Sequence, residues 1–242
     1  MVRTVFVLTL VWVSAAISSP LALVFMLLKS VGLGLHASRP LAAAVRLWSK
    51  VILWSIGVKL DVSGMDNFPP DERLCFVGNH QGDLDIMIML AILPRPAGFI
   101  AKSQVAWFPF LNIWALALGS AFIVRNKPRQ GTKAIDKGVA RIRRGHAMII
   151  FPEGTRSRGY RLLPFRNGAF KLATRAEATI VPVSIDGSFH AWEEHLTIRA
   201  TRVSVVVHPP VRTAGLDADA RRALPGTIRA TIASGLSAPG LD

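Results

Sequence analysis

The chain has 242 residues, of which 51% are hydrophobic, and its mean hydropathy is +0.39. This hydropathy is too low for a protein that crosses the membrane many times and high for an ordinary soluble chain, and the length suits one domain with a full core. There are 29 Lys and Arg against 15 Asp and Glu, a formal net charge of +14, which indicates an anionic partner such as nucleic acid, an anionic membrane or a phosphate-bearing substrate. The single cysteine, Cys75, excludes an intrachain disulfide.

The N-terminal segment is strongly apolar. No charged residue occurs from Thr4 to Leu28, a length that would cross the hydrocarbon core of a bilayer as a straight helix. Pro20 is expected to break or kink that helix. A cleaved signal peptide is the alternative, because Arg3 precedes the apolar run and residues 14–16 resemble a cleavage site. The run continues well past that site, which favours an uncleaved membrane anchor.

A second helix is predicted over residues 40–56. Arg39, Arg46 and Lys50 share one of its faces, and apolar residues fill much of the remainder, so the helix can lie in the headgroup layer of a membrane. The alternative is an amphipathic helix that packs on the domain's own core. From Lys29 to Lys59 there are five Lys or Arg and no acidic residue, which predicts a cell-membrane protein with its main domain on the cytoplasmic side. Residues 1–56 are thus expected to anchor a separate domain, residues 57–242.

The remainder of the chain alternates short β-rich runs with helical ones. Strands are predicted at 58–62, 74–78, 98–101, 121–124, 147–151, 179–185 and 203–207, and helices at 84–92, 110–118, 131–144, 167–176 and 218–234. This alternation predicts an α/β domain, with a mostly parallel or mixed sheet of about seven strands flanked by helices. Pro225 and Gly226 are expected to interrupt the last helix.

A histidine and an aspartate follow the second predicted strand. His80 lies just past its end, and Asp85 starts the next helix, which is a cleft position in an open α/β sheet. Asp85 is close enough in sequence to fix the tautomer of His80 and leave its other ring nitrogen as a general base. The alternative is that Asp83 or Asp85 caps the helix and His80 is an ordinary loop residue.

Two further strand ends carry arginine. Residues 151–157 (Phe-Pro-Glu-Gly-Thr-Arg-Ser) follow a strand, and Gly154, Thr155 and Arg156 offer backbone N–H groups and a guanidinium fork for a phosphate. The alternative for this segment is a turn with a surface salt bridge. Residues 119–125 form another strand that ends in arginine, which by itself is usually only solvated.

The three motifs, in this order and spacing, resemble the glycerophospholipid acyltransferases, especially the bacterial 1-acylglycerol-3-phosphate acyltransferases. His80 and Asp85 match the family's H-x4-D motif, while residues 119–125, 151–157 and 181–183 match its second, third and fourth blocks. The resemblance implies transfer of a fatty acyl chain from acyl-CoA or acyl-carrier protein to the sn-2 hydroxyl of 1-acylglycerol-3-phosphate. The product would be phosphatidic acid, made in phospholipid biosynthesis.

The resemblance also implies a role for each motif residue. His80 would deprotonate the acceptor hydroxyl, which attacks the thioester directly, and Asp85 would orient the imidazole. No metal and no cofactor besides the acyl donor are expected, and residues 181–183 would line the acyl or donor site. Glu153 is expected to orient an arginine or backbone donors. The residues expected to hold the acceptor are Lys102, Arg125, Glu153, Gly154, Thr155 and Arg156.

Three alternatives to this function stay open at the level of the sequence. The motifs do not identify the headgroup, so another lysolipid such as lyso-ornithine lipid is a possible acceptor. A non-catalytic membrane-bound scaffold on the same fold is disfavoured by the presence of His80, Asp85 and Arg156 together. Nucleic-acid binding is disfavoured because no stacking-aromatic or recognition-helix pattern accompanies the charge. Residues 125–175 contain 14 Lys or Arg and two acids, a charge of +12 that suits membrane lipids, a lysophospholipid acceptor or coenzyme A.

Two other features complete the prediction. Cys75 lies within an apolar strand and is expected to be a buried, inert thiol and not an acyl-enzyme nucleophile. Trp107, Phe108, Phe110 and Trp114 surround Pro109, and this aromatic cluster is either part of the core or a wall that contacts membrane or acyl chain.

Overall fold

Seven strands form one mixed sheet in the computed structural model, which describes residues 1–70, 73–123 and 128–237. Their order is β1-β7-β6-β2-β5-β3-β4, and among these described neighbours only β6 and β7 run antiparallel. The strands are β1 Val58–Ser63, β2 Leu74–Gly78, β3 Ala97–Lys102, β4 Ala121–Ile123, β5 Ala147–Ile150, β6 Thr179–Asp186 and β7 Thr201–Val207. The predicted α/β fold with a mixed sheet of about seven strands is confirmed.

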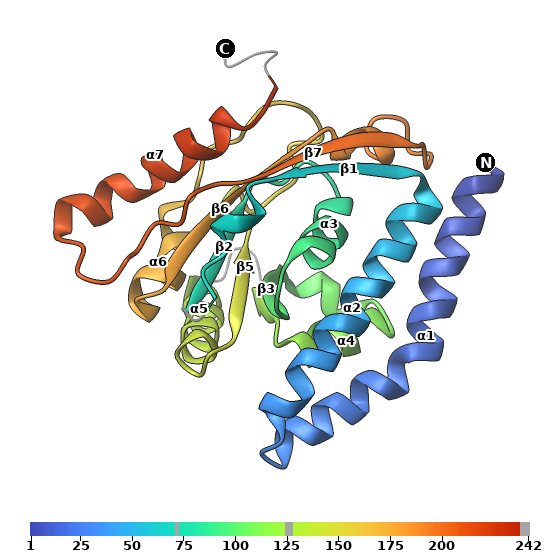
Figure 1. Cartoon of the computed structure of the whole chain (residues 1–242), viewed down its shortest axis with the longest axis horizontal. Helices are drawn as coiled ribbons and strands as arrows, with labels where there is room; N and C mark the ends of the chain where they lie inside the picture. Colours follow the sequence, from blue (N-terminus) through green and yellow to red (C-terminus); the bar gives the residue numbers. More distant parts are fainter. Residues whose placement is uncertain (71–72, 124–127, 238–242) are drawn as a thin grey trace.

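Helices cover both faces of the sheet (Figure 1). They are α1 Val2–Ser30, α2 Gly34–Ile56, α3 Leu84–Ile92, α4 Leu111–Leu118, α5 Pro128–Arg143, α6 Asn167–Ala176 and α7 Ala218–Ser234. Three short 3-10 helices, η1 Met65–Asn67, η2 Ser103–Trp107 and η3 Ser188–Ala191, lie in the connections.

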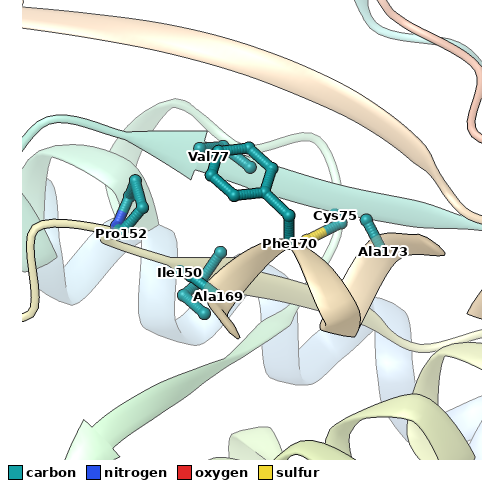
Figure 2. Close-up of a pocket in the computed structure, with 7 residues that line it drawn as sticks. All are labelled: Cys75, Val77, Ile150, Pro152, Ala169, Phe170 and Ala173. Atoms are coloured by element: carbon teal, nitrogen blue, oxygen red, sulfur yellow. The ribbon is translucent and has the colours of Figure 1, made fainter. Parts of the chain in front are cut away.

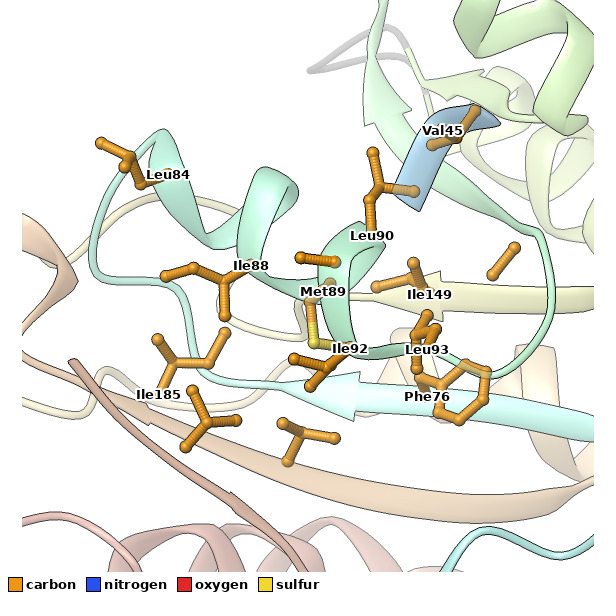
Figure 3. Packing of buried hydrophobic residues seen from close by; sticks show 14 of the residues in the cluster. Val45, Phe76, Leu84, Ile88, Met89, Leu90, Ile92, Leu93, Ile149 and Ile185 are labelled. Carbon is orange, nitrogen blue, oxygen red and sulfur yellow. The ribbon is translucent and has the colours of Figure 1, made fainter. Parts of the chain in front are cut away.

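The central strands are buried on both faces, as their continuous apolar sequences predict. In β2, Leu74 and Phe76 point into the core under α2 and α3, whereas Cys75 and Val77 point into the core under α5, α6 and α7. This alternation follows from the period of two along a strand. Figure 3 shows α3 lying over Phe76 and its neighbours in the first of these two cores. The central strand ends are therefore held rigidly from both sides.

The first helix runs from Val2 to Ser30 without a break at Pro20, and Figure 1 shows that it bends along its course. Of the two effects expected of this proline, the break is therefore absent. A proline has no N–H to give to the carbonyl four residues earlier, which here is that of Ala16. The hydroxyl of Ser19 donates to this carbonyl at 2.8 Å and replaces the missing bond. The last helix is likewise continuous through Pro225, against expectation, and there the unpaired carbonyl belongs to the solvent-exposed residue Arg221.

The first helix also lies along the domain over its whole length. The side chain of Thr4 accepts from the Ile198 N–H at 3.0 Å, and the Trp114 indole donates to Ser18 at 3.1 Å. Near its end, the Lys29 ammonium donates to the carbonyl of Ala117 in α4. Among the described residues, α1 alone has the length and hydropathy needed to cross a membrane, and much of its other side exposes large apolar side chains. The division into an anchor (1–56) and a domain (57–242) stays a prediction.

Candidate active site

The candidate site lies where β2 ends between β5 and β6. Immediately before His80, the side-chain amide of Asn79 donates to the carbonyl of Ile185 and accepts from its N–H, both at 2.8 Å. Immediately after it, the carbonyl of the Gln81 side chain accepts from the N–H groups of Gly187 at 2.9 Å and Ser188 at 3.2 Å. These bonds tie the His80 loop to the end of β6 and fix its path.

His80 and Asp85 form a hydrogen-bonded pair, as predicted from their spacing. The distance from His80 Nδ1 to Asp85 Oδ2 is 2.8 Å, and the Asp85 side chain is fully buried. The same oxygen accepts from the Gly82 N–H at 2.9 Å, and the other oxygen accepts from the hydroxyl of Ser188. Since a carboxylate only accepts, the hydrogen of the imidazole is on Nδ1, and Nε2 keeps the lone pair that a general base needs.

The helix-capping alternative does not describe this arrangement. Asp83 stands at the N-cap of α3 but makes no side-chain capping bond there. Asp85 lies in the first turn, and its carboxylate is directed to the His80 ring. The geometry is that of an oriented imidazole.

The His80 ring is also fixed from its face. It stacks on Phe151, with ring centroids 4.3 Å apart and an interplanar angle of 13°. The His80 side chain remains 15% exposed, so its outer edge is accessible to a substrate. Phe151 belongs to the third motif, but no role for it was predicted.

Glu153 connects the third motif to the His80 loop. One carboxylate oxygen accepts from the His80 N–H at 2.7 Å and the other from the Leu163 N–H at 3.1 Å. The side chain thus holds backbone donors, which is one of the two arrangements expected of it. Burial raises the pKa of the Glu153 carboxyl to about 7, although the two N–H groups act in the opposite direction. Gly154 adopts a φ of +66°, which favours glycine at this turn.

Arg156 lies beside His80 but is engaged by two carboxylates. Its guanidinium donates to Asp83 and, at 3.2 Å, to Glu193. The Glu193 side chain is only 2% exposed, one of its oxygens has no partner among the described residues, and burial raises its pKa. The ion pair that the sequence left as an alternative is therefore present, next to the candidate base.

The other predicted site residues are placed less directly. Lys102 ends β3, parallel to β5, at the same edge of the sheet as His80, and Thr155 is partly exposed in the third-motif loop. Arg125 lies outside the described residues. Val181 and Val183 are fully buried within β6. The structure therefore brings together His80, Asp85 and the third motif.

Cys75 lies in the hydrophobic core and not at the site. It is 1% exposed, and Figure 2 shows it among Val77, Phe170 and Ala173. Burial raises the pKa of its thiol to about 12, so the nucleophilic thiolate is strongly disfavoured. The expectation of a buried thiol is confirmed.

Ser188, Gln81 and Glu193 contribute to the site but carried no signal in the sequence. Ser188 and Glu193 lie 103 and 110 residues from the residues that they contact, Asp85 and Asp83. Among the described residues, no three His, Cys, Asp or Glu side chains are grouped so that they could hold a metal ion.

Comparisons with known proteins identify the family of the chain. Residues 59–186, just over half the chain, match the model of the acyltransferase family. The chain is 30% identical over 166 residues to a 1-acyl-sn-glycerol-3-phosphate acyltransferase of Borreliella burgdorferi, covering 68% of this chain and 66% of that one. It is 31% identical over 176 residues to the mouse (Mus musculus) 1-acyl-sn-glycerol-3-phosphate acyltransferase alpha, covering 72% and 62%. The chain thus spans just under two thirds of the length of these relatives.

A solved structure has the same fold. The crystal structure of the 1-acyl-sn-glycerophosphate acyltransferase PlsC from Thermotoga maritima superposes with a TM-score of 0.78. The match covers 97% of this chain and 95% of that one, at 23% sequence identity. The likeness extends through the N-terminal helices and concerns the fold.

Proposed function

Because the chain belongs to the acyltransferase family, we propose that it is a membrane-associated O-acyltransferase whose acceptor is a lysophospholipid. The acceptor we propose is 1-acylglycerol-3-phosphate, acylated at its sn-2 hydroxyl to give phosphatidic acid for phospholipid biosynthesis. The donor is a fatty acyl thioester, acyl-CoA or acyl-carrier protein. The observation that carries the proposal is the imidazole of His80, held at 2.8 Å by the fully buried carboxylate of Asp85.

In the proposed reaction, Nε2 of His80 takes the proton of the acceptor hydroxyl as its oxygen attacks the thioester carbonyl carbon. The new C–O ester bond forms, the C–S bond breaks, and the departing thiolate takes the proton back from the imidazolium. Asp85 stabilises that imidazolium through Nδ1. Positioned acid–base catalysis of this kind contributes about 10²–10⁴-fold to a rate.

The basic third-motif loop supports an acceptor that carries phosphate. Arg156 lies beside His80 through the contacts of its neighbour, because the Ser157 N–H donates to the His80 carbonyl at 2.8 Å. A phosphate that exchanges places with Asp83 on the guanidinium would put the glycerol hydroxyl next to the imidazole. Lys102, Arg125, Gly154 and Thr155 are proposed to complete this phosphate site, and Glu153 to position the His80 loop.

The ion pairs of Arg156 also favour a second candidate acceptor. Asp83 and Glu193 together offset the positive charge beside His80. A lysolipid with an ammonium group, such as lyso-ornithine lipid, would find carboxylate partners in this position. Both acceptors use the same acyl-transfer chemistry.

We further propose that α1 lies in one leaflet of the cell membrane, with the domain on the cytoplasmic side. Thr4 and Lys29, near the two ends of α1, bond to polar backbone groups of the domain. If α1 crossed the bilayer, these polar groups of the domain would enter the hydrocarbon with it. An orientation with the apolar side of α1 toward lipid avoids this cost. The excess of Lys and Arg after α1 supports the cytoplasmic side.

The acceptor is tested with purified protein, labelled acyl-CoA or acyl-carrier protein, and a panel of lysolipids separated by thin-layer chromatography. We expect labelled phosphatidic acid from 1-acylglycerol-3-phosphate, and none from the His80→Ala variant. Faster acylation of lyso-ornithine lipid would select the second candidate. No acylation of any lysolipid by folded wild-type protein would contradict the enzymatic proposal and favour a scaffold.

A further inference from the structure

A basic cavity lies at the end of the sheet opposite to His80. It has a volume of about 360 Å³ and is lined by Lys137, Ala140, Arg141, Arg144 and His146. His146 immediately precedes β5, whereas His80 follows β2, the parallel neighbour of β5. At about 3.3 Å per residue, the two histidines are on the order of 15–20 Å apart. The cavity is therefore separate from the candidate active site.

Three of the lining cations come from the end of α5, and Lys29 of α1 lies close to them, because its ammonium binds Ala117 and the Arg141 guanidinium lies against Gly119. Lys137, Arg141 and Arg144 are spaced by four and three along α5 and just past its end, so they form one stripe. Lys29 comes from the end of α1, where its ammonium contacts α4. Burial, and then the charges of Lys29, Arg141 and Arg144, lower the pKa of His146.

No carboxylate offsets this charge within the described chain. None of the lining cations makes an ion pair there, whereas on the neighbouring side of α5 Asp136 pairs with Arg175 at 2.6 Å and Arg143 donates to the Arg175 carbonyl at 2.7 Å. Burial and the charge of Arg144 lower the pKa of Arg141. The dipole at the end of α5 favours a cation in its last turn. That effect does not account for a hollow that His146 also lines, with Lys29 close by.

We propose that this basic cavity binds the phosphate group of an anionic lipid headgroup, at a second site distinct from the one beside His80. Four basic side chains that line a cavity, with Lys29 close by, are suited to a phosphate, for which arginine supplies paired donors. A lipid is favoured over a soluble phosphate because Lys29 ends the long uncharged run of α1. Val24, Leu27 and Val31, next to it in sequence, are exposed and offer an apolar surface for acyl chains.

The test compares binding to phosphatidylcholine vesicles with and without phosphatidic acid, measured by flotation. The double variant Lys137→Gln/Arg144→Gln changes two exposed side chains, and Arg221→Gln/Arg222→Gln on α7 makes the same change of charge elsewhere. We expect phosphatidic acid to strengthen the binding of the wild-type protein to vesicles. In the cavity variant, this gain in binding should be roughly 10- to 30-fold smaller. The α7 variant should lose much less. Equal losses in the two variants would overturn the site in favour of non-specific attraction.

A second arm separates a lipid from a free phosphate. Inorganic phosphate and adenosine 3′,5′-bisphosphate are added to each protein in neutral detergent, and the thermal unfolding midpoint is followed. A rise that the cavity variant alone lacks, together with unchanged vesicle binding, would overturn the lipid assignment. If the cavity variant without ligand has the same unfolding midpoint as the wild-type protein, the variant is folded. Because the readout is binding, failure here leaves the proposed acyl transfer intact.

Discussion

Asp85 accepts three hydrogen bonds, and the donor of one of them, the Ser188 hydroxyl, lies 103 residues later in the sequence. Ser188 fixes the oxygen of Asp85 that does not face the imidazole. Removing it leaves a fully buried carboxylate oxygen without its donor, which costs about 1–3 kcal/mol and frees the carboxylate to rotate. Ser188 therefore acts through Asp85 as a positioning residue.

We predict that Ser188→Ala lowers kcat about 10- to 100-fold with little change in KM. The reason is that the acceptor and donor do not touch Ser188, while the orientation of His80 depends on it. Steady-state kinetics on Ser188→Ala, Ser188→Thr and the exposed control Ser234→Ala measure this. The threonine variant should recover part of kcat, and an equal effect on kcat from the control would refute the role of Ser188.

The contact between His80 and Asp85 was predictable from the sequence alone, but the residues that support it were not. His80 and Asp85 are five residues apart, so their contact is local and follows from a strand–turn–helix pattern. Ser188 and Glu193 reach the site only because β6 lies next to β2 in the sheet. No spacing rule within one sequence gives that adjacency. The pairing of Arg156 with Asp83 depends in the same way on β5 lying on the other side of β2.

Glu153 makes stability depend on pH. Its pKa in the folded protein, about 7, lies above its ordinary value of 4.5, so the folded state holds the proton more tightly. The stabilisation is fully present below the unfolded pKa and is lost as the pH rises through about 7. At 1.36 kcal/mol per pKa unit, the loss is roughly 3 kcal/mol.

We therefore predict that Glu153→Gln, which cannot titrate, gains roughly 3 kcal/mol relative to wild type between pH 4 and pH 8. Urea unfolding in detergent at the two pH values gives the free energies of unfolding. The exposed Asp219→Asn is the control. A difference between Glu153→Gln and wild type that is the same at both pH values would show that Glu153 does not titrate in this range.

At the level of secondary structure, the central strands and most helices of the α/β domain were predictable, and the start of α2 was not. The continuous apolar runs of β2, β5 and β6 reflect burial on both faces, which sequence reports directly. The limits of α7 were predicted correctly although the helix continues through Pro225, whereas α2 begins at Gly34, before Pro40, which was taken as its first residue. Compensation by a neighbouring side chain decides such cases, and sequence patterns do not show it.

Ser19 and Pro20 give a direct test of that compensation. We predict that Ser19→Ala lowers the free energy of unfolding by about 1 kcal/mol, because the Ala16 carbonyl then loses its only replacement donor. In a Pro20→Ala background the backbone N–H is restored, so the same Ser19→Ala change should cost close to nothing. Thermal unfolding of the four proteins in detergent forms a double-mutant cycle. Equal costs in both backgrounds would refute the compensation.

For the whole molecule, the contacts along α1 decide how the protein meets the membrane. The helix is about 43 Å long at 1.5 Å per residue, and it touches the domain near both ends. The active-site loop lies near its start, since Ile198 follows Glu193, and the basic cavity lies near its end. The candidate active site and the basic cavity can therefore face the same membrane surface only if α1 lies along that surface.

We predict that cysteines at the two ends of α1 are labelled from the same side of the membrane. Arg3→Cys and Ser30→Cys are made separately in a Cys75→Ala background, and membrane vesicles of each orientation are treated with an impermeant maleimide. Ser234→Cys on α7 marks the side of the domain. Labelling of positions 3 and 30 from opposite sides would show that α1 crosses the bilayer.

In the proposed mechanism, the imidazole of His80, held by the carboxylate of Asp85, performs acyl transfer. Its most direct measurement is kcat for transfer from acyl-CoA to 1-acylglycerol-3-phosphate by Asp85→Asn, with Asp219→Asn as the matched control. An amide at position 85 keeps the size of the side chain but no longer stabilises the imidazolium, and such a change typically costs about 10³- to 10⁴-fold in kcat. We predict a loss of that size for Asp85→Asn and none for Asp219→Asn. A folded Asp85→Asn protein with kcat near the wild-type value would contradict the account.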